Sequence, residues 1–166
     1  LKEPGGKQDQ YTAAYGGINL FQFNSDDAVL VRPVIMSAER RKELEGYLLL
    51  VFTGAERSSG SIHEVQDSTV RDHLEGYYRV RELAYRAHDL LSRGDFEELG
   101  RLVGENWGVK KTFAPSISNP DIDAIYEKGL RAGAIGGKLQ GAGGGGFMLF
   151  LVHPSKKPDV IKALSD

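Results

Sequence analysis

The segment from Gly136 to Gly146 constrains this chain more than any other, because seven of its eleven residues are glycine. The apolar run 147–152 follows it directly. Glycine has no Cβ and tolerates positive φ, so consecutive backbone N–H groups can converge on an anion, at an entropic cost that ordinary turns do not need. The segment therefore predicts a phosphate-binding loop. A plain glycine hairpin or a tight packing site is the structural alternative.

The spacing of the glycines excludes the better-known phosphate motifs. Gly141, Gly143 and Gly146 satisfy G-x-G-x-x-G, but a dinucleotide site needs a strand before the motif and a helix after it. Here a strand pattern follows. No Gly-Lys-Ser/Thr closes the tract, which excludes a P-loop, and no His-Arg-Asp loop of a protein kinase comes after it. A phosphate at this loop would be bound in another way.

The composition is that of an ordinary globular protein with one good core. The chain has 166 residues, of which 40% are apolar and 27% charged. A net charge of -2 and a pI near 6.1 give no footprint for nucleic acid or for an anionic membrane. We therefore expect a small-molecule partner whose phosphate is met by local groups.

The cysteine count, the length of the apolar runs and the spacing of the histidines limit the cellular compartment and the metal chemistry. The absence of cysteine excludes disulfides and thiolate chemistry, which fits a reducing cytoplasm. The longest apolar runs, 47–52 and 147–152, are too short to cross a bilayer, and we expect no leader segment. The four histidines show no ligand-like spacing, so we expect no transition-metal site.

The first fifty residues alternate between helix, turn and strand patterns. A helix is predicted from Lys7 to Tyr15 behind the turn Pro4-Gly5-Gly6, and a hairpin is predicted from strands 18–23 and 29–34. The charged stretch 37–46 separates this piece from a strand at 47–52. We place a domain boundary inside that stretch, which gives domains 1–40 and 41–166.

The rest of the chain is mainly helical until the glycines. Apolar spacing predicts a helix that ends at Gly94, a second helix with a capping box at Asp95 and Glu98, and a third that Asn119 caps. A short strand around 138–140, the glycine loop, a strand at 147–152 and a helix from about Lys157 follow. This order predicts an α+β fold with helices on an antiparallel sheet, and both candidate sites on loops at one edge.

Several side chains are candidates for binding or catalysis, each with an ordinary structural alternative. Asp9 lies near a helix N-terminus, where it could accept a hydroxyl proton or simply cap its helix. Arg57 and Ser58, in a polar segment after a strand, could bind a sugar phosphate or form a capping turn. Four lysines could bind phosphate or be ordinary surface groups. They are Lys110 and Lys111 at a helix end, Lys138 on a strand edge and Lys7 before a helix.

Two motifs taken together resemble those of the GHMP small-molecule kinases. They are Pro4-Gly5-Gly6-Lys7-Gln8-Asp9-Gln10-Tyr11 with Gly16-Gly17, and the stretch from Gly137 to Gly146. Within that superfamily the chain is most similar to sugar kinases of the heptose 7-phosphate kinase type. That similarity runs through Phe52-Thr53-Gly54, Asn106-Trp107 with Lys110-Lys111, and Ile117-Ser118-Asn119-Pro120.

The resemblance implies the C-terminal part of an ATP-dependent enzyme that phosphorylates a heptose phosphate for nucleotide-sugar synthesis. It assigns catalysis to Asp9 and closure over the phosphates to Gly141, Ala142, Gly143, Gly144, Gly145 and Gly146. The nucleotide loop and most of the Mg²⁺ ligands are expected upstream of Leu1, in a missing N-terminal half, so the 166 residues alone are expected to be inactive. A fucokinase- or galactokinase-like enzyme and a non-catalytic phosphate or sugar-phosphate binding module are the alternatives.

Overall fold

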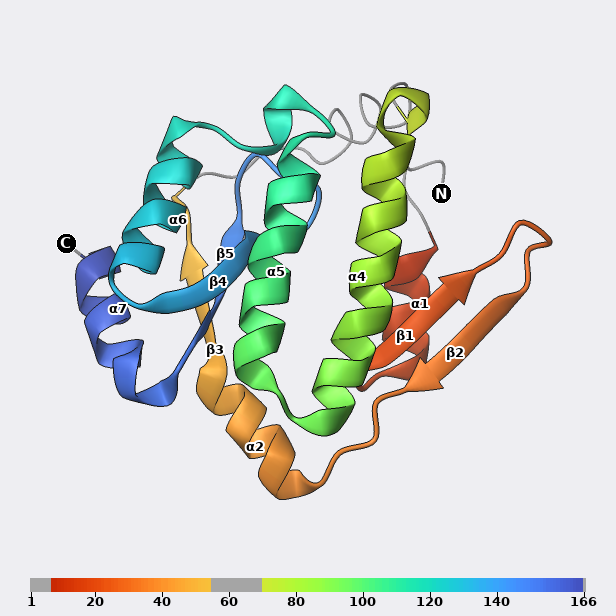
Figure 1. Cartoon of the computed structure of the whole chain (residues 1–166), viewed down its shortest axis with the longest axis horizontal. Helices are drawn as coiled ribbons and strands as arrows, with labels where there is room; N and C mark the ends of the chain where they lie inside the picture. Colours follow the sequence, from red (N-terminus) through yellow and green to blue (C-terminus); the bar gives the residue numbers. More distant parts are fainter. Residues whose placement is uncertain (1–6, 55–69, 166) are drawn as a thin grey trace.

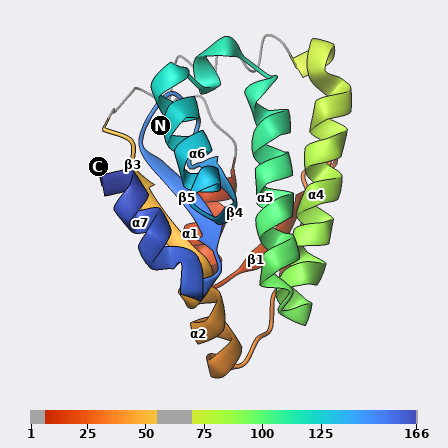
Figure 2. The ribbon, with the colours of Figure 1, turned by 60° about the vertical axis from the view of Figure 1, so that its left-hand side comes forward.

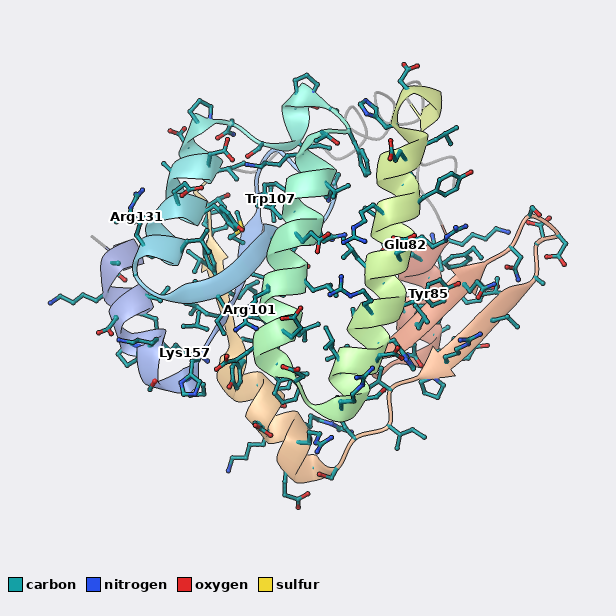
Figure 3. The ribbon with its side chains drawn as sticks, viewed as in Figure 1. Glu82, Tyr85, Arg101, Trp107, Arg131 and Lys157 are labelled. Carbon is teal, nitrogen blue, oxygen red and sulfur yellow. The ribbon has the colours of Figure 1, made fainter. Side chains whose placement is uncertain are left out.

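The computed structural model describes residues 7–54 and 70–165. It begins with helix α1 (Gln8–Tyr15) and an antiparallel hairpin of β1 (Asn19–Phe23) and β2 (Val29–Pro33), which confirms both predicted elements. These elements lie beside helix α4 (Leu74–Arg93) (Figure 1). The Tyr85 hydroxyl of α4, labelled in Figure 3, donates a 2.9 Å hydrogen bond to Gln22 Oε1 of β1.

The main sheet has three antiparallel strands in the order β3-β5-β4. Strand β5 (Phe147–Val152) is the centre, β3 (Leu48–Phe52) is one edge and β4 (Ala134–Leu139) is the other. The sheet places residues from both ends of the chain side by side, since Leu49 pairs with Phe150. This confirms the α+β fold with an antiparallel sheet.

The segment that holds the predicted domain boundary is a helix, α2 (Ala38–Tyr47). Ser37 caps it by accepting a hydrogen bond from the Arg40 N–H, and Leu44 is its one buried residue. Ala, Glu, Arg and Lys favour helix without an apolar stripe, so the periodicity gave no signal here. The division into domains 1–40 and 41–166 stays a prediction.

Three helix boundaries after residue 70 lie where capping residues predict them: the end of α4 and the starts of the next two helices. A short 3₁₀ turn η1 (Val70–His73) leads into α4, which ends at Gly94 in the left-handed conformation. Asp95 caps α5 (Phe96–Lys111) through the Glu98 N–H, and Asn119 caps α6 (Pro120–Arg131). The remaining pieces are the 3₁₀ turns η2 (Pro115–Ile117) and η3 (Pro154–Lys156) and helix α7 (Lys157–Ser165).

The core lies between the sheet and the helices that cover it. Helix α5 runs along β4 and β5, α4 packs on the outer side of α5, and α6 packs beside α7 (Figure 2). The largest fully buried side chains are Trp107 on α5 and Phe150 on β5. Burial of this apolar surface is the main term that stabilises the fold.

Two of the tract's glycines are strand residues and do not belong to the loop. Strand β4 begins at Ala134, four residues before the predicted start, and includes Gly136 and Gly137. A Cβ on Gly136 would lie 2.1 Å from the carbonyl oxygen of Gly100 on α5, and one on Gly137 would lie 2.7 Å from the Phe150 ring. Glycine is therefore required here because backbone meets backbone, so this half of the tract is the tight packing site.

The other half of the tract is a true glycine turn between β4 and β5. Gly141, Gly143, Gly144 and Gly146 all have positive φ, which other residues adopt only with strain. The Gly144 N–H donates to the Ile117 carbonyl at 2.9 Å, and a Cβ on Gly143 would lie 2.8 Å from Ile117 Cα. The turn is thus held against η2.

Substituting Gly136→Ala tests the contact between α5 and β4. We expect a loss of about 3 kcal/mol in the free energy of unfolding, because the new methyl group meets a backbone carbonyl that cannot rotate away. Gly108→Ala on the same helix is the control, since its Cβ would meet nothing within 4 Å, and it is expected to stabilise by up to ~1 kcal/mol. Equal urea midpoints for the two variants would contradict this account.

Candidate active site

A pocket of about 560 Å³ joins residues from both ends of the chain. Its walls come from α1, α4, α5, β4 and the start of the glycine turn. Among the predicted site residues it brings together Asp9, Lys110, Lys138, Gly141 and Ala142. The other lining residues are Gln8, Tyr77, Val80, Asn106, Phe113 and Gln140.

Asp9 is the second residue of α1 and is exposed at the pocket. The residue at the helix start, Lys7, makes no side-chain capping bond. Within residues 7–54 and 70–165 the Asp9 carboxylate also makes no capping hydrogen bond and no ion pair. The positive end of the helix favours its negative charge. The carboxylate is therefore available to accept a hydrogen bond from a ligand hydroxyl.

Two lysines face the pocket from neighbouring elements. Lys138 of β4 donates a 3.0 Å hydrogen bond from Nζ to Asn106 Oδ1 of α5, and Lys110 of α5 donates from Nζ to the Gly141 carbonyl. Burial lowers the pKa of Lys138 below its ordinary value. Burial, and next the positive charge of Lys138, lower the pKa of Lys110 to about 8. Both ammonium groups are thus held where their charge is poorly solvated.

Another part of the pocket lining is apolar. Tyr77 of α4 stacks on Phe113 with ring centroids 4.3 Å apart and planes 12° from parallel. Val80 lies one turn further along α4. The pocket therefore offers a carboxylate, two cations and a flat apolar face, which are the groups that bind a polar, anionic small molecule with one apolar side.

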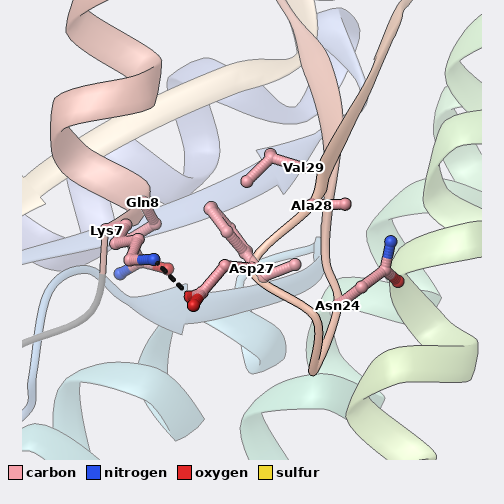
Figure 4. A pocket seen from close by; sticks show the side chains of 7 residues that line it. Lys7, Gln8, Asn24, Asp27, Ala28 and Val29 are labelled. Atoms are coloured by element: carbon pink, nitrogen blue, oxygen red, sulfur yellow. Dashed lines mark hydrogen bonds and ion pairs between the residues drawn. The ribbon is translucent and has the colours of Figure 1, made fainter.

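The side chain of Lys7 lines another cavity, beside the β1–β2 hairpin. Its Nζ forms a 3.0 Å ion pair with Asp27 at the tip of the hairpin, and that hydrogen bond raises the pKa of Lys7. The pair lines a second cavity of about 300 Å³, together with Phe23, Asn24, Ala28 and Val29 (Figure 4). Gln8 lines both cavities. Substrate binding by Lys7 stays a prediction that this geometry does not favour.

Lys111 is also engaged away from the pocket lining. Its Nζ lies 3.0 Å from Asp123 Oδ1, which also accepts a hydrogen bond from Ser118 Oγ, and 5.8 Å from the centre of the Trp107 ring. These contacts join α5 to the start of α6, so they favour a structural role. The predicted binding residues Arg57 and Ser58 lie outside the described residues.

The glycine turn contributes less to the pocket than predicted. Gly141 and Ala142 line it, whereas Gly143, Gly144, Gly145 and Gly146 do not. The Gly144 N–H is already donated to Ile117, and the Gly146 carbonyl accepts from both the N–H and the hydroxyl of Thr53. Phosphate binding by the whole turn therefore stays a prediction, and its visible role is to fix the position of Gly141.

Asn106 is the pocket residue that sequence reasoning should have found. It follows Leu102 by four residues and Val103 by three, which puts a polar side chain on the apolar stripe of α5. Lys110 continues the same line four residues later. A polar residue on a buried face needs a partner, and here the partner is Lys138.

Neither a metal cluster nor a membrane span is found in the part of the chain that the structure describes. No group of three or more histidine or acidic side chains there could hold a metal ion. No helix there is both long and apolar enough to cross a membrane.

Comparison with known proteins agrees with this fold. Residues 87–166 match the family described as GHMP kinases C terminal. The chain is 37% identical over 96% of its length to a D-glycero-alpha-D-manno-heptose 7-phosphate kinase of Campylobacter jejuni, and 32% identical over 92% to a bifunctional fucokinase/GDP-fucose pyrophosphorylase of Arabidopsis thaliana. A crystal structure of a D-glycero-D-manno-heptose 1-phosphate kinase from Bacteroides thetaiotaomicron covers 97% of the chain with a TM-score of 0.70 and 32% identity.

The chain spans 48% of the Campylobacter protein, 15% of the Arabidopsis protein and 42% of the Bacteroides structure. It aligns with them over nearly its whole length, and its C-terminal half matches the family's own C-terminal domain. The chain therefore contains a C-terminal domain of the GHMP kinases, at residues 87–166.

The electrostatics of the lysine pair can be measured directly. We expect the side chain of Lys110 to titrate with a midpoint of about pH 8 in the folded protein, followed by NMR of its Cε and Hε signals. Because the pKa is lowered from 10.5, this group's contribution to stability rises with pH between about 8 and 10.5.

Removing the neighbouring charge should move that midpoint. Lys138→Met is expected to raise the pKa of Lys110. Lys162→Met, at an exposed position of α7, is expected to leave the pKa of Lys110 unchanged. A Lys110 midpoint near 10.5 in the unchanged protein would show that the two lysines are well solvated and contradict the described burial.

Proposed function

We propose that this chain is the C-terminal half of an ATP-dependent sugar kinase that phosphorylates a heptose phosphate for nucleotide-sugar synthesis. The observation that supports the proposal best is the pocket itself, which is lined by Asp9 from one end of the chain and by Lys138 and Gly141 from the other. The similarity to kinases of heptose phosphates supports the substrate class.

Phosphoryl transfer requires an aligned acceptor, neutralisation of charge on the moving group and a place for the hydroxyl proton. Asp9 accepts the proton of the acceptor hydroxyl. The hydroxyl oxygen then forms a bond to the terminal phosphorus, the bond from that phosphorus to the bridging oxygen breaks, and ADP leaves with the electron pair. Tyr77 and Phe113 give the sugar an apolar wall that excludes water from one side.

The described residues fit ATP in part. ATP, when bound, supplies the phosphoryl group, and the cationic side of the pocket suits an anionic ligand. Within the described residues Asp9 is the one carboxylate on the pocket and no metal cluster is present, so we place the ligands of Mg²⁺ in the upstream half. No step of the proposed reaction here depends on the metal.

The upstream half of the same protein is the proposed partner of the α1 and hairpin face. Four aromatic side chains pack together there, and Tyr15 and Phe23 remain 60% and 43% exposed. Clustered exposed aromatics favour an interaction surface over a solvent-facing one. The net charge of -2 predicts that neither nucleic acid nor a membrane is a partner. Location in the cytoplasm stays a prediction.

The alternatives differ in what the pocket must bind. A fucokinase- or galactokinase-like enzyme takes an unphosphorylated sugar, for which two partly buried cations have no evident use. A non-catalytic phosphate or sugar-phosphate binding module has no need of a carboxylate beside the anion site, because a negative charge weakens anion binding. Asp9 on the pocket wall therefore favours a kinase.

Asp9→Asn tests the catalytic assignment. We expect kcat of the full-length protein to fall roughly 10²- to 10⁴-fold, because the amide cannot take the hydroxyl proton. The measurement is ADP release with ATP, Mg²⁺ and the heptose 7-phosphate.

Asp121→Asn is the matched control. Asp121 is likewise exposed and second in its helix, α6, so both changes remove the same interaction with a helix N-terminus. Only the Asp9 variant should lose turnover. Turnover of the Asp9 variant within about threefold of the control would remove Asp9 from the chemistry.

A further inference from the structure

Lys110 and Lys138 form a pair of cations whose hydrogen-bond partners within the described residues are both neutral. Lys138 Nζ donates to the Asn106 amide oxygen at 3.0 Å, and Lys110 Nζ donates to the Gly141 carbonyl. Neither forms an ion pair within the described residues. Other cations of the chain, such as Lys111 and Arg79, are matched by carboxylates.

The pair is costly without an anion. The two lysines come from α5 and β4, whose backbones the glycine contact holds close together. Like charges in a partly buried pocket repel each other and lose hydration. A doubly charged anion between them would relieve both effects, and the pocket wall beside them is open to solvent through a space of about 560 Å³.

We propose that Lys110 and Lys138 bind a phosphate monoester that the acceptor sugar already carries, and that they select a phosphorylated sugar over a free one. This inference rests on the kinase function proposed above and names the specificity of the same site. A phosphate monoester has two negative charges and three acceptor oxygens near neutral pH, which matches two ammonium donors.

A nucleotide phosphate is the other possible source of the anion, and the arrangement favours the acceptor. The lysines share their pocket with Asp9, whose proposed partner is the acceptor hydroxyl, and with the apolar wall of Tyr77 and Phe113 that suits a sugar face. A kinase with a phosphorylated acceptor brings two separate anionic groups to one cleft. Each of them needs its own cations, and the cavity that this pair shares with Asp9 assigns the pair to the acceptor.

The experiment compares acceptors that differ only in the phosphate. The full-length protein, Lys110→Met and Lys138→Met are assayed with D-glycero-D-manno-heptose 7-phosphate and with D-glycero-D-manno-heptose, at varied ATP. Methionine keeps the apolar stem and removes the charge, and either variant alone is sufficient if the other fails to fold. Lys162→Met, at an exposed position of α7, is the control.

We expect kcat/KM for the heptose 7-phosphate to fall roughly 10- to 100-fold in each lysine variant, chiefly through KM. For the unphosphorylated heptose and for ATP we expect changes within about threefold. An equal loss for both acceptors, or a rise in KM for ATP with no change for the acceptor, would overturn the assignment and leave the kinase function intact.

Binding measurements separate the two proposals. If the unchanged protein phosphorylates no sugar, the kinase function fails, and calorimetry with heptose 7-phosphate decides the role of the lysines. Binding to the unchanged protein that is lost in Lys138→Met supports the phosphate site. Equal binding to both proteins, or none to either, overturns it.

Discussion

The contact between α5 and β4 is the constraint on which the rest of the structure depends. Backbone meets backbone there, since a Cβ on Gly136 would lie 2.1 Å from the Gly100 carbonyl oxygen. The close approach sets the register of Asn106 and Lys110 on the helix against Lys138 on the strand, and it fixes where the glycine turn begins. The contact between Gly100 and Gly136 thus positions both the core elements and the side chains of the pocket.

This constraint explains why one glycine tract has two roles. Gly136 and Gly137 are needed for packing, whereas Gly141, Gly143, Gly144 and Gly146 are needed for positive φ. The two requirements are physically different, although both select glycine. Composition alone therefore could not divide the tract, and the structure shows that the loop N–H groups are partly used by the protein itself, as at Gly144.

The parts of the fold that could be predicted are those governed by local interactions. Asp95 and Asn119 cap their helices, Gly94 ends one, and the turn between β1 and β2 lies where its polar residues predict it, because each depends on neighbours a few residues away. Helix α2 was not predicted because it buries only Leu44 and has no apolar stripe. The pocket depends on tertiary contacts, so sequence identified Asp9, Lys110 and Lys138 individually but could not separate them from Lys7 and Lys111, whose carboxylate partners are distant in sequence.

We propose that Asp9 and the lysine pair bind the same acceptor molecule, Asp9 at the hydroxyl and the lysines at the phosphate. A crystal structure of the full-length protein with a non-hydrolysable ATP analogue and heptose 7-phosphate tests it most directly. The account predicts the sugar's phosphate within about 3 Å of the Nζ atoms of Lys110 and Lys138, and an acceptor hydroxyl at a similar distance from the Asp9 carboxylate. An acceptor bound with its phosphate away from both lysines, or with Asp9 turned out of the pocket, would contradict it.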